Sequence, residues 1–205
     1  MNEALPISHN QAIKAHTWLT NNFGHIITKQ DRYSPELVSA IFCQETAQRV
    51  LLWVDKYPAD IVLQRCVFDA SGDAPNSSRN AFPKNAAEFH NRYGDEFTDM
   101  LIAEANKMRR MPQPGDADGW GASHFLYKGY GIFQMDLQHV VGDELFFRNK
   151  LWYDFEECFN RLTKELDTKK ALSANEREMV RRYNGAGVNA ENYADNVMEF
   201  KAMFK

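Results

Sequence analysis

Apolar residues recur at steps of three and four along most of the chain, which is the spacing of amphipathic helices. The pattern predicts a helix over about 11–22, a second that starts at Ser34 and carries Glu45, and a third over about 97–108. Ser173 and Glu176 form a capping box for a further helix that the glycines of 183–187 should end. Two apolar stripes of the last third are most simply explained by core packing: Trp152, Phe155, Phe159, Leu162 and Leu166, and in a final helix Tyr193, Val197, Phe200 and Phe204.

Polar and glycine-rich stretches interrupt these helices. A break is expected at Asn21–Gly24, a loop at 71–80, and irregular chain at 111–121, where prolines and glycines gather. Any strands should be short and lie between about 112 and 135, where there is room for a small hairpin. The pattern therefore predicts a mainly α-helical protein.

Composition narrows the class of protein. At 205 residues and 44% hydrophobic content, the chain can form one large domain or two small ones. A net charge of −4 with scattered basic residues argues against binding to nucleic acid. No stretch approaches the roughly 20 apolar residues of a membrane span, and the N-terminus lacks the features of a secretory signal peptide. We therefore expect synthesis in the cytoplasm and no membrane insertion.

Cysteine and histidine usage suggests neither disulfides nor a metal site. Cys43, Cys66 and Cys158 are odd in number and lack metal-ligand spacing, so all three are expected to be reduced. His90, His124 and His139 form no metal or triad pattern. The Asp116–Gly119 fragment lacks the later glutamate of a calcium loop. We expect no metal and no cofactor.

Glu45 is the most informative residue. It lies in the middle of the apolar stripe formed by Val38, Ile41 and Phe42, to which Leu52 and Trp53 return if the helix runs that far. Burial disfavours a charged carboxylate and raises its pKa, as a general acid requires near neutral pH. The structural alternative is an ordinary ion pair with Arg49, one helical turn away.

Three sequence islands carry a resemblance to the lysozyme-like superfamily, which cleaves peptidoglycan, and within it to the goose-type lysozymes. Cys43–Thr46 resembles the family's "S-x-E-S" segment at the Glu, and Gly131–Asp136 is similar to "G-x-M-Q-V/I-D". Arg182–Gly187 resembles "A-Y-N-A-G" as a "Y-N-x-x-G" variant, and Tyr193–Val197 resembles "Y-A-N-D-V". The resemblance covers roughly half of the chain. It implies one α+β lysozyme-like domain over 1–205: a helical bundle around the Glu45 helix, with at most a small β-hairpin and an inserted lobe at about 55–112.

The resemblance implies a muramidase that cuts the MurNAc–GlcNAc β-1,4 bond of a peptidoglycan strand, with Glu45 as general acid. Inverting hydrolysis also needs a carboxylate that activates water, and Asp136 is the candidate; its alternative role is to cap a helix that starts near Leu137. Ala122 stands where the goose-type pattern has an Asp after "GWG". Tyr183 is expected to bond to and orient Glu45, or to be an ordinary core tyrosine.

The remaining site residues are assigned to substrate binding. The amides of Gln134 and Asn184 suit the acetamido groups of an amino sugar, Tyr130 and Trp120 could stack on sugar rings, and Gly131 belongs to the same motif. Each is also a plausible loop-packing residue.

Two other functions remain open. A lytic transglycosylase forms 1,6-anhydro ends and needs no second carboxylate, and a non-catalytic module would bind the cell wall without cutting it. The absence of a signal fits an endolysin released at lysis, an exported effector with an export or immunity partner, or a piece of a longer protein.

Overall fold

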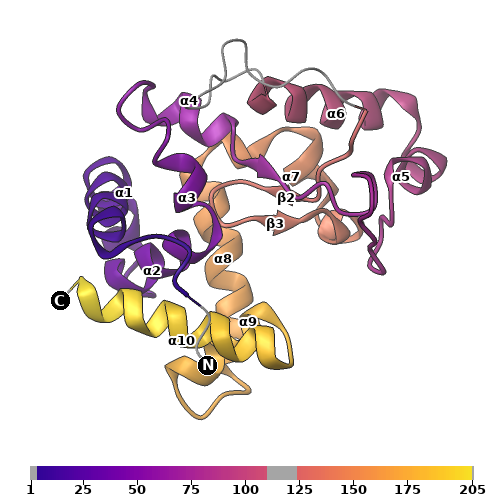
Figure 1. Ribbon diagram of the computed structural model, residues 1–205. Coiled ribbons are helices and arrows are strands. Elements are labelled where there is room, and N and C mark those ends of the chain that lie inside the picture. Colours follow the sequence, from indigo (N-terminus) through magenta and orange to yellow (C-terminus); the bar gives the residue numbers. More distant parts are fainter. Residues whose placement is uncertain (1–3, 110–123, 205) are drawn as a thin grey trace. The chain divides into compact units, whose positions relative to one another are not determined.

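The computed structural model describes residues 4–109 and 124–204, and these form a mainly helical protein with a small antiparallel sheet (Figure 1). The described residues contain ten α-helices, two short 3-10 helices (η) and three strands. This confirms the predicted helical class. The chain divides into a first unit, Met1–Lys56 with Phe159–Lys205, and a second unit, Tyr57–Cys158. The lobe expected at about 55–112 falls almost wholly within the second unit, and the single-domain organisation stays a prediction.

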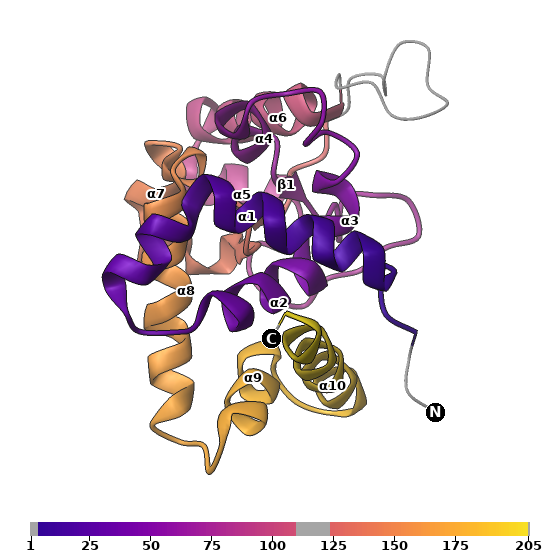
Figure 2. The same ribbon diagram turned by 90° about the vertical axis from the view of Figure 1, so that its left-hand side faces the viewer.

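The first unit is built around α2 (Pro35–Glu45), the helix that carries Glu45. The Ser34 hydroxyl accepts a hydrogen bond from Leu37 N at 3.3 Å, and Pro35 stands in the first turn, as the sequence predicts. α2 packs against α1 (His9–Gln30) and α10 (Val188–Met203), and Figure 2 shows it between them. Most of its residues from Leu37 to Cys43 are therefore buried. The predicted bundle around this helix is confirmed.

The break predicted at Asn21–Gly24 is wrong, because α1 continues to Gln30. The Asn22 side chain donates to the Trp18 carbonyl at 2.8 Å, so its amide bonds back along the helix. Trp18 also contacts the rings of Phe23 and Phe42, at centroid distances of 5.7 and 5.8 Å. Packing of α1 on α2 thus outweighs the weak helical propensity of these residues.

The Glu45 helix is shorter than the apolar pattern suggests. α2 ends at Glu45, and Thr46 leaves the helical region with φ −133° before α3 (Ala47–Val50) begins. Leu52 and Trp53 consequently lie beyond α3, although Trp53 is still buried. The helix therefore does not run as far as Leu52 and Trp53.

The C-terminal helices agree closely with the predicted pattern. The stripe from Trp152 to Leu166 is buried along the 3-10 helix η2 (Leu151–Tyr153) and α8 (Phe155–Lys170). α9 (Glu176–Asn184) follows, and its cap is Asn175, whose Oδ1 accepts from Glu178 N at 2.9 Å. Ser173 instead donates to the Lys169 carbonyl at 2.7 Å, so the predicted capping box is wrong by two residues.

The second unit joins four helices to the sheet: α4 (Ala59–Gln64), α5 (Ala86–Tyr93), α6 (Asp95–Arg109) and α7 (Glu144–Arg148). β2 (Gly129–Tyr130) and β3 (Met135–Asp136) form the hairpin expected in this region, with Gly129 opposite Asp136. β1 (Val67–Phe68) pairs antiparallel with β2. Sequence patterning missed β1 because a two-residue strand has no measurable period.

All three cysteines are buried, and none of them forms a disulfide bond. Burial raises the pKa of the Cys43 thiol to about 12, which makes it unreactive near neutral pH. Among the described residues, no helix is long and apolar enough to cross a membrane.

Candidate active site

Glu45 occupies the C-terminal end of α2, at the point where the helix breaks. The side chain is only partly exposed, beside a helix that is otherwise packed on its neighbours. Burial removes water from the carboxylate and raises the pKa of Glu45 to about 7. The raised pKa keeps the protonated form of Glu45 accessible near neutral pH, as a general acid requires.

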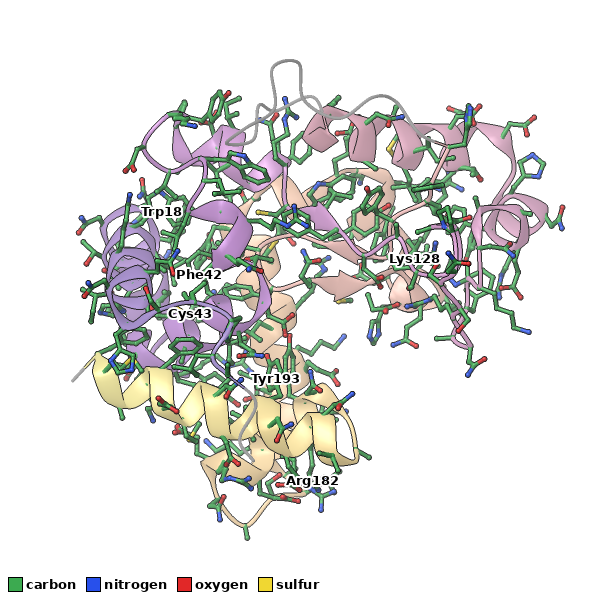
Figure 3. The ribbon with its side chains drawn as sticks, in the orientation of Figure 1. Trp18, Phe42, Cys43, Lys128, Arg182 and Tyr193 are labelled. Atoms are coloured by element: carbon green, nitrogen blue, oxygen red, sulfur yellow. The ribbon has the colours of Figure 1, made fainter. Side chains whose placement is uncertain are left out.

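Tyr193 on α10 holds the Glu45 carboxyl in place. Its hydroxyl donates to Oε1 of Glu45 at 2.6 Å, and Figure 3 marks Tyr193 and, on α2, Cys43. This bond stabilises the charged carboxylate and so lowers the Glu45 pKa, but the desolvation outweighs it. The second oxygen, Oε2, is outside this bond.

Tyr183, which the sequence assigns to orienting Glu45, lies in the last turn of α9. Its ring is 6.2 Å from that of Tyr193, with the planes tilted by 44°. Burial raises the Tyr183 pKa well above its usual range, and the charge of Glu45 raises it further. The structure thus brings Tyr183 close to Glu45, but the tyrosine shown to bond to the carboxyl is Tyr193.

The alternative role of Glu45 was an ion pair with Arg49. Because α2 ends at Glu45 and α3 restarts after Thr46, the two residues are not on one continuous helix. Arg49 is exposed on α3, and the hydrogen bond that lowers the Glu45 pKa is donated by the Tyr193 hydroxyl. The raised pKa also opposes an ion-pair role, because a paired carboxylate has a lowered one.

Asp136 performs the structural role that the sequence left open for it. It caps the 3-10 helix η1 (Leu137–Val141), with Oδ1 accepting from Gln138 N at 2.7 Å. The same oxygen accepts from Arg79, which also donates to the Pro83 carbonyl at 3.1 Å. The role of Asp136 as a catalytic base stays a prediction. Its carboxylate already accepts the capping hydrogen bond and forms an ion pair with Arg79.

A buried charge pair supports the loop that carries Arg79. Lys128, marked in Figure 3, is fully buried and pairs with Asp73. Asp73 in turn accepts from Ala86 N at 2.8 Å, and Lys128 N donates to the Asp69 carbonyl at 2.8 Å. These bonds attach the 69–86 loop to the hairpin of the second unit.

Two of the predicted sugar-binding residues are buried in the core. Tyr130 is 1% exposed and packs edge-on against Trp152 and Phe147, so it has no face for a sugar ring. Gly131 is buried with φ +78°, and a Cβ there would approach Cys158 Sγ to 2.6 Å. The motif glycine is thus required by packing. The burial of this turn could not be predicted from the sequence, because exposed and buried turns contain the same types of residue.

The other predicted binding residues remain predictions. Gln134 is partly exposed and adopts φ 53°, with its amide donating to the Gly131 carbonyl at 2.8 Å. Asn184, the last residue of α9, is exposed. Trp120, with Asp116, Asp118 and Ala122, lies outside the described residues.

Glu45, Tyr183, Tyr193 and Asn184 therefore belong to the first unit, and Asp136, Gln134, Tyr130 and Gly131 to the second. Sequence reasoning missed the role of Tyr193, although it placed this residue both in the core stripe of the final helix and at the start of the "Y-A-D-N-V" segment. A tyrosine that lies both in an apolar stripe and in a motif has a buried hydroxyl that needs a partner, and this could have identified Tyr193 from the sequence.

Comparisons with protein-family models, with curated proteins and with solved structures found no match for this chain. Among the described residues, no three His, Cys, Asp or Glu side chains gather as a metal-binding group.

Proposed function

We propose that this protein is a peptidoglycan-cleaving glycosidase, a lysozyme-like muramidase in which Glu45 is the general acid. The observation that carries the proposal is a carboxyl group with a pKa near 7, partly exposed and held by one neutral hydrogen bond. Cleavage of a glycosidic bond requires protonation of the departing sugar oxygen, and such a carboxyl can supply the proton. The three motif islands support the wall polymer as the substrate.

The helical context supports the same role. Glu45 lies on a helix buried between two others, and Tyr193 bonds to only one carboxyl oxygen. A rigid helix and a fixed hydrogen bond hold an acid in one orientation, which proton transfer to a bound sugar requires. The ring of Tyr183 is 6.2 Å from that of Tyr193, and the charge of Glu45 raises the Tyr183 pKa, so Tyr183 is also close to the carboxyl group.

Lytic transglycosylase activity is a second candidate, and the state of Asp136 favours it. Hydrolysis with inversion uses a second carboxylate to activate water, whereas a transglycosylase uses the sugar's own 6-hydroxyl group as the nucleophile. Asp136 is occupied by Arg79 and by its capping bond. A reaction that needs no second carboxylate is therefore consistent with this site.

Replacing Glu45 by Gln tests both enzyme classes. Glu45→Gln keeps the shape and can still accept the Tyr193 bond, but it has no acidic proton. General acid catalysis contributes about 10²- to 10⁴-fold, so clearing of a cell-wall suspension should fall by that factor. Glu199→Gln, which removes an exposed carboxylate from α10, serves as the control and should retain full activity.

Mass spectrometry of the fragments separates the two reactions, since anhydro ends are lighter than reducing ends by one water molecule. If Glu45→Gln clears the suspension as fast as the unaltered protein, the proposed role of Glu45 is wrong. Co-sedimentation of the unaltered protein with peptidoglycan, without any released fragment, would instead identify a non-catalytic binding module.

A further inference from the structure

The second unit contains a buried carboxylate that gathers positive charge around it. Glu104 on α6 is 1% exposed. Its Oε1 accepts from Lys107 at 2.6 Å and from Lys150 at 2.7 Å, and its Oε2 accepts from the Tyr153 hydroxyl. Both lysines are partly exposed, so the cluster can be reached from solvent.

Arg65 adds a third cation to the same region. It follows α4 and precedes β1, and α4 packs against η2 while β1 packs against α6. These are the elements that carry Tyr153 and Glu104. Burial raises the pKa of the Tyr153 hydroxyl, and the positive charge of Arg65 opposes that rise, which also indicates that the two side chains are close.

The Arg65 guanidinium is incompletely satisfied. Its Nε and Nη1 are buried, and in the described part of the chain neither has a hydrogen-bond partner. No carboxylate among the described residues forms an ion pair with it. A buried N–H group of a charged side chain is strongly disfavoured without an acceptor, so an acceptor other than the described residues is expected here.

A second buried donor lacks a partner in the same unit. Tyr130 is 1% exposed, and its hydroxyl has no partner among the described residues. Its ring contacts Trp152, the neighbour of Tyr153 in η2, at 4.9 Å. Burial raises the Tyr130 pKa, and the charge of Glu104 raises it further, so the hydroxyl is near the cluster.

The charges in the cluster do not balance. Arg65, Lys107 and Lys150 are three cations, and Glu104 is the one carboxylate that contacts the lysines. Water could accept the free N–H bonds, and it screens the charge of the two partly exposed lysines, but it cannot pair with the Arg65 charge. An oxyanion would do both, because its oxygens accept several charge-assisted hydrogen bonds.

We propose that Arg65, Lys107 and Lys150 form a binding site for a small oxyanion, a phosphate or a carboxylate group, beside the buried Glu104. The site lies wholly in the second unit and does not depend on the proposed glycosidase activity. Phosphate and carboxylate share the acceptor chemistry that the three cations recognise, and the experiment below distinguishes them.

Thermal unfolding of the full chain tests the site with inorganic phosphate, acetate and chloride at equal ionic strength. A ligand at about 100 times its Kd should raise the melting temperature by roughly 5–10 °C in a protein of this size. A larger rise in phosphate than in acetate assigns a phosphate group, and the reverse assigns a carboxylate. Equal curves in all three salts would overturn the proposal and leave water as the partner of Arg65.

Variants locate the site. Arg65→Gln should weaken binding of phosphate by at least 10-fold, and Lys107→Gln, a partly exposed position that should fold normally, by several-fold. Lys84→Gln removes an equal charge from an exposed position of the same unit and should leave binding unchanged.

The NMR signal of the Arg65 Nε–H group gives a direct readout in the unaltered protein. It should move on addition of phosphate. If this signal stays fixed, or if Lys84→Gln weakens binding as much as Lys107→Gln, the anion binds elsewhere and the proposal fails.

Discussion

Glu45 in the first unit and Glu104 in the second are carboxylates that are both shielded from water, but their pKa values shift in opposite directions. Glu104 is the more deeply buried, yet its pKa is lowered, because hydrogen bonds from Lys107, Lys150 and Tyr153 outweigh the effect of burial. Glu45 is partly exposed, yet its pKa is raised to about 7, because burial is opposed only by the Tyr193 hydroxyl.

The difference shows that the partners of a carboxylate, together with its burial, decide which protonation state is stable. Two ammonium groups hold Glu104 charged, as a structural ion cluster requires. A single neutral donor leaves the protonated form of Glu45 accessible, as an acid catalyst requires. The same substitution at the two positions should therefore have effects of opposite sign.

Glu104→Gln should lower the stability of the protein at neutral pH. Removing the charge leaves Lys107 and Lys150 without their shared partner, and breaking such a pair costs about 3 kcal/mol, the lower end of the usual range because both lysines reach solvent. Since the folded pKa is lowered, the loss should be complete at pH 7 and shrink as the pH falls below about 4. Urea unfolding at both pH values measures it.

Glu96→Gln is the control for this change, because it removes an exposed carboxylate from the same helix. It should alter the free energy of unfolding by less than about 0.5 kcal/mol. Equal losses in the two variants would show that the Glu104 cluster contributes no specific stability.

Glu45→Gln should stabilise the protein above neutral pH. A folded pKa of about 7 against an ordinary value of 4.5 means that the folded state binds more protons between these pH values, so stability falls as the pH rises. At pH 8 the penalty reaches about 3 kcal/mol, which the neutral amide avoids. The gain should vanish below pH 4, and urea unfolding of Glu45→Gln at pH 4 and pH 8 checks it. A variant less stable than the unaltered protein at pH 8 contradicts the raised pKa.

Tyr193→Phe should have the smallest effect, on the pH profile of wall cleavage. The Tyr193 hydroxyl lowers the Glu45 pKa, so its removal should move the loss of activity at high pH upward by as much as about one pH unit. Tyr183→Phe is the matched comparison, since Tyr183 was the partner expected from sequence. An equal or larger shift in Tyr183→Phe would return the orienting role to that residue.

Much of the fold follows from local sequence. The apolar stripes of α6, α8 and α10 and the Ser34–Pro35 start of α2 were all correctly predicted, because helical periodicity and capping depend on residues within one turn of each other. The break expected in α1 is not found, because the helix runs through the polar stretch and packs Trp18 against the distant Phe42.

The candidate site divides in the same way. The sequence by itself determined that Glu45 would lie on an apolar helix and lose water, since that depends on its own neighbours along α2. Only the tertiary structure decided that Tyr193, 148 positions further along the chain, would bond to it, and that Tyr130 and Gly131 would be buried. Hydrogen bonds between distant segments depend on how helices pack, and no pattern within one segment encodes that packing.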